Sequence, residues 1–228
     1  MELTYTNAPE NKPKYLLVYG FSGLGKTTLA KTLPHDEVLI LDSEGGLSVL
    51  SDVNIASHAL KRVPEEKRFA KLQEFLKEIQ KPELKAKFKY IFVDSLTELT
   101  QNIEKYLKLE LKLDGFKFWG EYTNIIVDLV KFFRDLDHYT VIFTALEERI
   151  DDEAEGTYCY GPSIGGKKAK SFLMPNFDIV MRMLMAPDGS RKLVTKPTPK
   201  TQAKDRSGVL LELEEPNLAT ILEKVRKK

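Results

Sequence analysis

The stretch of sequence that decides the fold is Tyr15-Leu16-Leu17-Val18-Tyr19-Gly20-Phe21-Ser22-Gly23-Leu24-Gly25-Lys26-Thr27-Thr28. Its first five residues form a short apolar run that ends at a glycine, as expected for a strand buried on both faces of a sheet. The remainder matches G-x-x-x-x-G-K-[ST], the P-loop pattern. Glycines let successive backbone N–H groups approach phosphate oxygens, and the following helix adds the positive end of its dipole. We therefore predict a phosphate-binding loop over 20–28 and a helix from Gly25 to about Pro34.

Such a loop assigns roles to two of its side chains. Lys26 is expected to contact the β- and γ-phosphates of a nucleoside triphosphate, and the Thr27 hydroxyl to coordinate Mg²⁺. The sequence thus predicts binding of ATP with Mg²⁺, although no residue visibly reads the base. A signalling GTPase is disfavoured because the guanine motif N-K-x-D is missing from the sequence.

Two carboxylates follow later buried strands. Asp94 comes directly after the apolar run 90–93 and is the expected magnesium-orienting carboxylate, although acidic residues often end strands. Glu44 lies just beyond the run 38–41, next to two glycines, where it could orient the attacking water. The alternative for Glu44 is a carboxylate that only stabilises the start of a helix.

Strands and helices alternate along the first two thirds of the chain. This order predicts an α/β fold, a P-loop NTPase core with a mainly parallel central sheet and helices on both faces. The last third reads as an antiparallel extension of the sheet. We expect a single domain over 1–228, with a lead at 1–13 and a C-terminal helical segment at 214–228. The expected helices are 64–80, 96–113, 121–136 and 218–227, and the expected later strands are 140–144, 179–185, 192–195 and 209–213.

Composition limits the functional classes only weakly. The 228 residues carry 35 basic and 34 acidic side chains, so any anion-binding surface must be local. The single cysteine, Cys159, excludes an internal disulfide and a cysteine-based zinc site. The N-terminus lacks the pattern of a signal peptide and no apolar run is long enough to span a membrane, so we expect a cytoplasmic protein without membrane contact.

The carboxylates carry a resemblance to a known family. The D-x-E context of Asp42-Ser43-Glu44 resembles RecA-type recombinases, whose catalytic glutamate follows the strand after the P-loop helix, and Asp94-Ser95 resembles the end of their Walker B strand. In AAA+ proteins and many helicases the catalytic glutamate directly follows the Walker B aspartate, and here that place is Ser95. The resemblance therefore favours a RecA-like ATPase over an AAA+ protein.

A second resemblance lies near the C-terminus. The segment 203–208, Ala-Lys-Asp-Arg-Ser-Gly, is similar to the K-x-R segment of RecA-like hexameric helicases and RadA-type proteins. The resemblance implies that Lys204 and Arg206 reach the γ-phosphate of a neighbouring subunit, as an arginine finger does. It thus implies a homo-oligomer, a ring or a filament; the alternative is a solvated basic turn.

Taken together over about 14–215, the order of motifs resembles phage-encoded RecA-like nucleotide-binding proteins, including Sak-type single-strand-annealing ATPases. It comprises the P-loop, D-S-E-G-G, hhhhD-S, G-P-x-x-G-G-K-K, F-D-x-V-x-R and K-D-R-x-G. This resemblance implies a role in DNA recombination in a bacterial host cell. One departure is that RecA proteins have a polar amide at the end of the strand after Walker B, where this chain offers Thr144 or Glu147 as γ-phosphate sensor.

The resemblance also implies two DNA-binding loops. They correspond to 114–122 and 148–171, and the second contains Lys167, Lys168 and Lys170 beside two glycines. Ammonium groups and aromatic side chains suit the tracking of single-stranded DNA, whereas the alternative is a solvated charged face. Expected partners are single-stranded DNA and its binding protein. Two other functions stay open, a small-molecule or nucleotide kinase and a nucleotide-dependent switch with little turnover.

Overall fold

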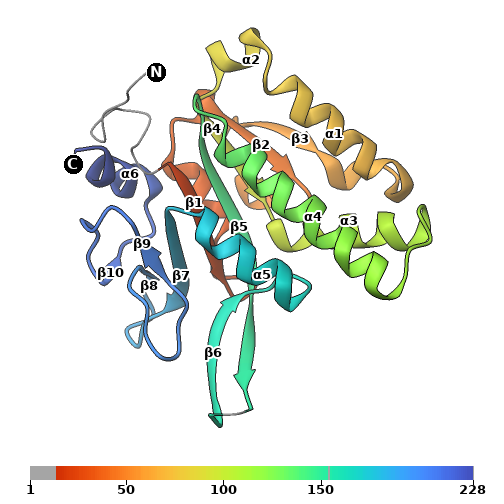
Figure 1. The fold of residues 1–228 in the computed structure, drawn as a ribbon. Helices are drawn as coiled ribbons and strands as arrows, with labels where there is room; N and C mark the ends of the chain where they lie inside the picture. Colours follow the sequence, from red (N-terminus) through yellow and green to blue (C-terminus); the bar gives the residue numbers. More distant parts are fainter. Residues whose placement is uncertain (1–13, 154, 228) are drawn as a thin grey trace, which may run out of the picture.

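The structure, a computed structural model, describes residues 14–153 and 155–227, so the predicted lead at 1–13 lies outside the described residues. One sheet of ten strands forms the centre, in the order β10-β8-β7-β1-β5-β4-β2-β3, with β6 on β5 and β9 on β7 (Figure 1). The strands are β1 Tyr15–Gly20, β2 Val38–Asp42, β3 Ala56–Ala59, β4 Tyr90–Asp94, β5 Thr140–Asp152, β6 Thr157–Pro162, β7 Ile179–Met185, β8 Arg191–Val194, β9 Lys204–Asp205 and β10 Leu213–Glu214.

The pairing confirms a mainly parallel sheet with an antiparallel extension. Strand β1 is parallel to β5 and β7, and β4 is parallel to β5 and β2. Strands β8, β9 and β10 add antiparallel pairs beyond β7. The α-helices are α1 Arg68–Glu78, α2 Pro82–Lys87, α3 Leu96–Leu109, α4 Gly115–Arg134, α5 Lys167–Leu173 and α6 Leu218–Arg226, and the P-loop leads into the 3₁₀ helix η2 Thr27–Thr32.

Strand β1 explains why the sheet is covered on both faces. Successive side chains of a strand point to opposite faces. Tyr15, Leu17 and Tyr19 enter the core cluster that includes residues of α1, α3 and α4. Leu16 and Val18 enter a second cluster, with residues of η2 and α6. In Figure 1, α1, α3 and α4 lie on one side of the sheet and α6 on the other.

Several predicted boundaries are wrong. Helix α3 ends at Leu109 and α4 already begins at Gly115, so 114–122 is mostly helix and not a loop. The described residues of 148–171 also lie mostly in regular elements, because β5 continues to Asp152, pairs with β6, and is followed by α5. The predicted P-loop helix is shorter than expected and 3₁₀ in geometry. Strand β3 was not predicted.

The predicted strand 209–213 is wrong for a physical reason. Its backbone N–H groups bind side chains in place of a neighbouring strand: Leu210 donates to Asp205 Oδ2 at 3.2 Å, and Leu211 donates to Glu214 Oε1 at 2.9 Å. Only Leu213 and Glu214 pair with β8.

Within the described part of the chain, no helix has both the length and the apolar composition that a membrane span requires.

Candidate nucleotide-binding site

The P-loop connects the C-terminal end of β1 to η2. Gly23 and Gly25 have φ angles of +79° and +93°, which glycine adopts at little cost and other residues rarely do. The Lys26 side chain is buried, and its ammonium group donates to the carbonyl oxygens of Gly20 at 2.9 Å and Phe21 at 2.8 Å. The lysine thus lies folded across the loop that contains it.

Asp94 ends β4 beside this loop. The Thr27 hydroxyl donates to Asp94 Oδ2 at 2.8 Å, and the Thr144 hydroxyl donates to Asp94 Oδ1 at 2.5 Å. Thr144 is fully buried on β5, between β1 and β4 in the sheet. The P-loop threonine and the strand-end aspartate, predicted separately from the sequence, are therefore in direct contact.

Glu44 is carried to the same edge of the sheet. Asp42 and Asp94 are paired in register at the ends of β2 and β4. The backbone N–H groups of Ser43 and Glu44 donate to the Asp94 carbonyl at 2.7 and 3.2 Å. Gly45, with a φ of +87°, donates to Asp42 Oδ1 at 2.6 Å and closes the turn. The Glu44 side chain is exposed, unlike the buried Asp94.

The electrostatics of the site reflect how close these groups lie to one another. Burial lowers the pKa of Lys26, while the negative charges of Glu44 and Asp94 raise it. Burial raises the pKa of Asp94; the hydrogen bonds from Thr144 and Thr27 lower it, and the charges of Glu44 and Asp42 raise it. The carboxylates of Asp42, Glu44 and Asp94 thus lie close together beside the P-loop. A bound cation would reduce the repulsion between their negative charges.

These residues fit Mg²⁺ bound together with a nucleotide. Thr27 and Asp94 present oxygen atoms, the ligands that Mg²⁺ prefers. Within the described residues, no cluster of three or more His, Cys, Asp or Glu side chains forms a metal site of its own. Since Mg²⁺ is commonly held by one or two protein groups, substrate phosphates and water, this sparse ligand set suits a magnesium–nucleotide site.

The two sensor candidates have other partners. Thr144 binds Asp94 and so acts as a positioning residue for that carboxylate. Glu147 forms a two-point ion pair with Arg182, with distances of 2.7 Å from Nε to Oε2 and 2.9 Å from Nη2 to Oε1. The Glu147 side chain is only 1% exposed, so it is enclosed in this pair. Arg182 also stacks on Tyr160, 4.0 Å from the ring centroid.

Lys204 and Arg206 lie at the opposite edge of the sheet from the P-loop. Strand β9 pairs with the beginning of β7, next to the beginning of β1. The Lys204 ammonium donates to three backbone carbonyls, the shortest being Phe177 at 2.7 Å. Arg206 is half exposed and pairs with Asp178 at 3.1 Å. Both side chains therefore lie at the ends of the strands that are distant from the P-loop.

The two predicted DNA segments lie side by side. A Cβ atom built on Gly166, before α5, would lie 3.2 Å from the Trp119 ring of α4. Phe116 is 98% and Trp119 47% exposed. Lys168 is exposed, whereas Lys170 is partly buried and paired with Glu148. Lys167 begins α5.

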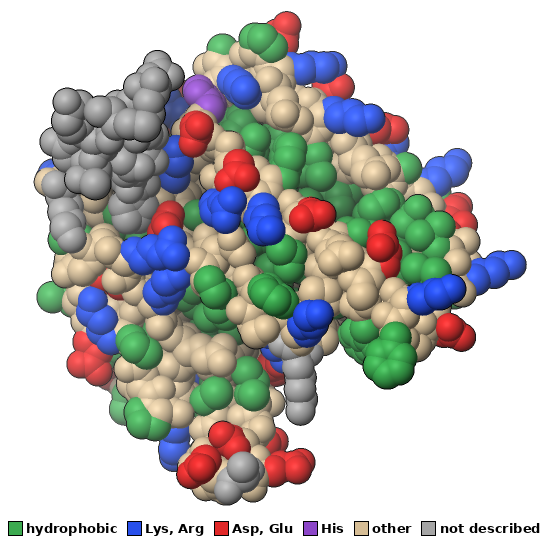
Figure 2. Space-filling model, viewed as in Figure 1, with side chains coloured by type: hydrophobic (Ala, Val, Ile, Leu, Met, Phe, Trp, Pro, Cys, Tyr) green, Lys and Arg blue, Asp and Glu red, His purple; other side chains and the backbone are tan. Residues whose placement is uncertain are grey.

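The β5–β6 hairpin has a different character. It projects beyond the rest of the sheet (Figure 1), and its tip is acidic, as the red side chains at the lower edge of Figure 2 show. The exposed residues there include Asp151, Asp152 and Glu153. Such a tip disfavours contact with the phosphate backbone of DNA.

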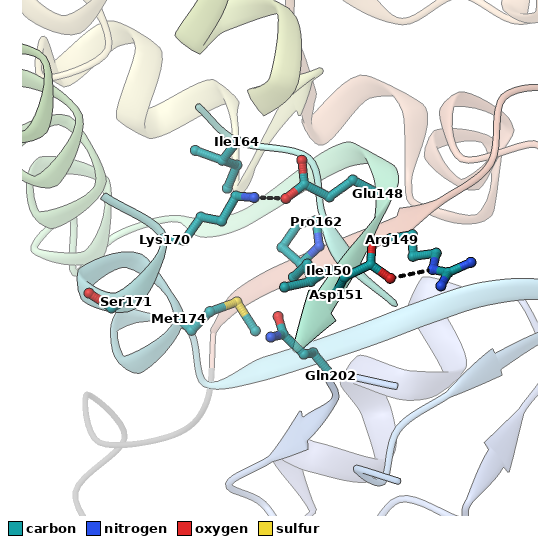
Figure 3. Close-up of a pocket in the computed structure, with 10 residues that line it drawn as sticks. All are labelled: Glu148, Arg149, Ile150, Asp151, Pro162, Ile164, Lys170, Ser171, Met174 and Gln202. Atoms are coloured by element: carbon teal, nitrogen blue, oxygen red, sulfur yellow. Dashed lines mark hydrogen bonds and ion pairs between the residues drawn. The ribbon is translucent and has the colours of Figure 1, made fainter. Parts of the chain in front are cut away.

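A cavity of about 670 Å³ lies between this hairpin and α5. Figure 3 shows its apolar lining, which includes Ile164 and Met174. Both cations that border it are neutralised by acids, Lys170 by Glu148 and Arg149 by Asp151. Among the described residues that line the cavity, no cation is therefore free for phosphate, and none of these residues belongs to the P-loop.

One residue beside the P-loop was not predicted from the sequence. Arg191, at the start of β8, lies against Gly25. No local motif marks it, because 165 residues separate it from Lys26 and only the strand order brings them together.

Ser95 follows Asp94 directly and caps α3 by accepting a hydrogen bond from the Glu98 backbone at 3.3 Å.

A family model described as an AAA domain matches residues 12–207. The chain belongs to the AAA domain family. No curated protein matches it. Together with the mainly parallel sheet and the P-loop at the end of β1, membership in this family assigns the chain a RecA-like P-loop fold.

Two similar solved structures have low identity to the chain. The chain is similar to a prototypical ATPase from the type III secretion system of pathogenic bacteria, with 14% identity and a TM-score of 0.50, over 76% of this chain and 51% of that one. It thus spans about half the length of that ATPase. It is also similar to the RadB recombinase, with 16% identity and a TM-score of 0.45, over 85% of this chain and 91% of that one.

Proposed function

We propose that this member of the AAA domain family hydrolyses ATP in a Mg²⁺-dependent reaction, with residues 20–28 binding the phosphates and Glu44 orienting the attacking water. The observation that carries the proposal is the contact between Thr27 and Asp94, 2.8 Å long, with Glu44 held beside it by the Asp94 carbonyl. Three groups with complementary roles in phosphoryl transfer thus meet at one edge of the sheet.

The chemistry follows from the position of each group. Lys26 releases the loop carbonyls when phosphate enters and stabilises the charge that develops on the transferred phosphoryl group. Mg²⁺, when bound, neutralises charge on the phosphate oxygens. Glu44, exposed beside the loop, orients water and accepts its proton, while Thr144 fixes the buried Asp94.

Replacing Glu44 with Gln tests the proposal. We expect turnover of ATP to fall by about 100-fold or more, because general-base catalysis contributes roughly that factor. Binding of ATP, measured by calorimetry, should be retained. Glu104→Gln is the control, since Glu104 pairs with Lys108 on the surface of α3. Equal turnover by Glu44→Gln and the wild-type protein would contradict the role of Glu44, and ATP binding without wild-type turnover would favour the switch.

We further propose that the ATPase acts on single-stranded DNA in recombination or annealing, as an oligomer and with a single-stranded-DNA-binding protein as a possible partner. The motif order supports this role, as does the surface where Trp119 of α4, near the exposed Phe116, adjoins the start of α5 at Gly166, with the exposed Lys168 on that helix. Exposed rings stack on bases and ammonium groups follow the backbone. The kinase alternative gains no support, since Arg149, which follows Glu148, is paired with Asp151.

A binding assay tests the DNA proposal. Fluorescence anisotropy with single-stranded DNA should show binding that weakens as salt rises. Trp119→Ala should weaken it by about 10-fold, the effect of losing one stacked base, and Lys168→Glu should weaken it as well. Lys85→Glu on α2 makes the same charge change away from this surface. DNA that neither binds nor changes the ATPase rate would contradict the proposal.

A further inference from the structure

Arg191 lies against the P-loop from a distant part of the sequence. A Cβ atom built on Gly25 would be 2.8 Å from Arg191 Nη1 and 3.4 Å from Arg191 Cζ. The same Cβ position is 3.7 Å from the Thr28 hydroxyl. The guanidinium group and the Thr28 hydroxyl therefore lie on the same side of Gly25.

The strand order shows which end of the site this is. Strands β7 and β8 lie on one side of β1, whereas β5, β4 and β2 lie on the other. Asp94 and Glu44, on β4 and after β2, mark the end where Mg²⁺ and the attacking water are proposed to act, near the γ-phosphate. Arg191 lies on the opposite side of the loop from Asp94 and Glu44. If the γ-phosphate faces those carboxylates, the α- and β-phosphates are the ones nearer to Arg191.

Arg191 is exposed, and its side chain forms no hydrogen bond or ion pair with the residues that the structure describes. Its neighbour Lys192 differs, because it pairs with Glu215. A guanidinium group presents five N–H donors in a planar fork that matches phosphate oxygens. An unpaired arginine beside a phosphate-binding loop is therefore available for a ligand.

A tight turn holds Arg191 in place. Ala186 N–H donates to the Ser190 carbonyl at 2.7 Å, and Asp188 accepts hydrogen bonds from the Ser190 backbone at 2.8 Å and from its hydroxyl at 2.6 Å. Arg191 then enters β8 opposite Met185 of β7. The backbone of the arginine is thus fixed before any ligand binds, which reduces the entropy lost on binding.

We propose that Arg191 binds the α- and β-phosphates of the nucleotide in its own subunit. This inference rests on the proposed binding of ATP by the P-loop. Because ATP and ADP share these phosphates, Arg191 should contribute equally to the binding of both. A contact that is equal in the ground state and the transition state changes KM and leaves kcat nearly unchanged.

Calorimetric titration with Mg-ADP and Mg-ATP, together with steady-state kinetics, tests this inference. For Arg191→Ala we expect both nucleotides to bind about 10- to 100-fold more weakly, the range for a lost hydrogen bond between charged groups, with kcat nearly unchanged. Arg191→Lys should recover part of the affinity. Lys192→Ala, which removes the neighbouring charge, should bind as the wild-type protein does. Unchanged thermal unfolding without nucleotide verifies that each variant folds.

Three results would overturn it. Unchanged ADP affinity of Arg191→Ala, with normal binding by the wild-type protein, contradicts this inference alone. A loss confined to ATP, or to kcat, contradicts the assignment to the inner phosphates and indicates a γ-phosphate contact. Failure of the wild-type protein to bind either nucleotide contradicts the proposed function, and with it the role of Arg191.

Discussion

At the scale of single residues, the side chain of Asp94 affects both the stability of the fold and the proposed function. It is 1% exposed and accepts hydrogen bonds from Thr27 and Thr144. Burial raises the pKa of its carboxyl group, which means that the ionised form is less stable in the folded protein than in the unfolded chain. A bound cation would reverse this preference.

Asp94→Asn should therefore separate stability from metal binding. Because the folded-state pKa is raised, Asp94 reduces stability as pH increases from its unfolded to its folded pKa, and this penalty persists at higher pH. We expect Asp94→Asn to unfold at a higher temperature than the wild-type protein at pH 7 without nucleotide. The additional stabilisation by Mg²⁺ in the presence of nucleotide should be lost.

Differential scanning fluorimetry over a pH series measures both effects. In the wild-type protein the Mg²⁺-dependent shift should grow as pH rises through the raised pKa of Asp94, because only the ionised carboxylate attracts the metal. Asp52→Asn, at an exposed ion pair with Lys31, is the control. An Asp94→Asn protein that is less stable and keeps the full Mg²⁺ shift would contradict this account.

At the scale of elements, the pair between Glu147 and Arg182 connects β5 to β7. Both strands flank β1, whose last residue, Gly20, begins the P-loop. The pair is shielded from water, with side chains 1% and 14% exposed. It thus ties together the two strands on either side of the strand that carries the loop.

Glu147→Ala should destabilise the protein by about 3–5 kcal/mol, because it leaves a buried guanidinium without its partner. The double variant Glu147→Leu with Arg182→Met should be closer to the wild-type protein, since it removes both charges. Urea denaturation measures the free energy of unfolding of each. Glu65→Ala, at an exposed pair with Lys105, should have little effect. A Glu147→Ala protein more stable than the double variant would contradict this prediction.

Elements also show what sequence patterns can predict. The strand 90–94 and the P-loop could be predicted because each is marked by a pattern of neighbouring residues. The pattern is an apolar run for the strand and the glycine spacing for the loop. The contact between Thr27 and Asp94 was foreseeable because parallel strands end at the same edge. The prediction of a strand at 209–213 was wrong because backbone N–H groups of this segment donate to the carboxylates of Asp205 and Glu214. Arg191 was not predicted as a site residue because Gly25, which it contacts, is distant in the sequence.

At the scale of the whole molecule, the two edges of the sheet have different proposed roles. The P-loop lies at one edge, and Arg206 lies half exposed at the other, paired with Asp178. We therefore expect Arg206, if it serves the proposed ATPase, to act on the nucleotide of another subunit. Lys204, bound to three carbonyls, is more firmly held in its own subunit.

Mixed oligomers test the action of Arg206 between subunits. Arg206→Ala alone should lower turnover by about 10³-fold or more, the usual effect of losing an arginine finger, without loss of nucleotide binding. Mixing it with Glu44→Gln should restore activity, because one variant supplies Arg206 and the other an intact site. Light scattering with ATP present gives the assembly size. Inactive mixtures that still assemble would contradict a role in trans.

In the proposed ATPase, residues 20–28 hold the nucleotide phosphates so that they face Asp94 and Glu44. A crystal structure of the wild-type protein with Mg²⁺ and a non-hydrolysable ATP analogue tests it most directly. We expect the phosphates to be bound by the loop backbone, with Mg²⁺ about 2.1 Å from the Thr27 hydroxyl and the γ-phosphate towards Glu44. Phosphates bound elsewhere, or a γ-phosphate directed towards β8 and away from both carboxylates, would contradict it.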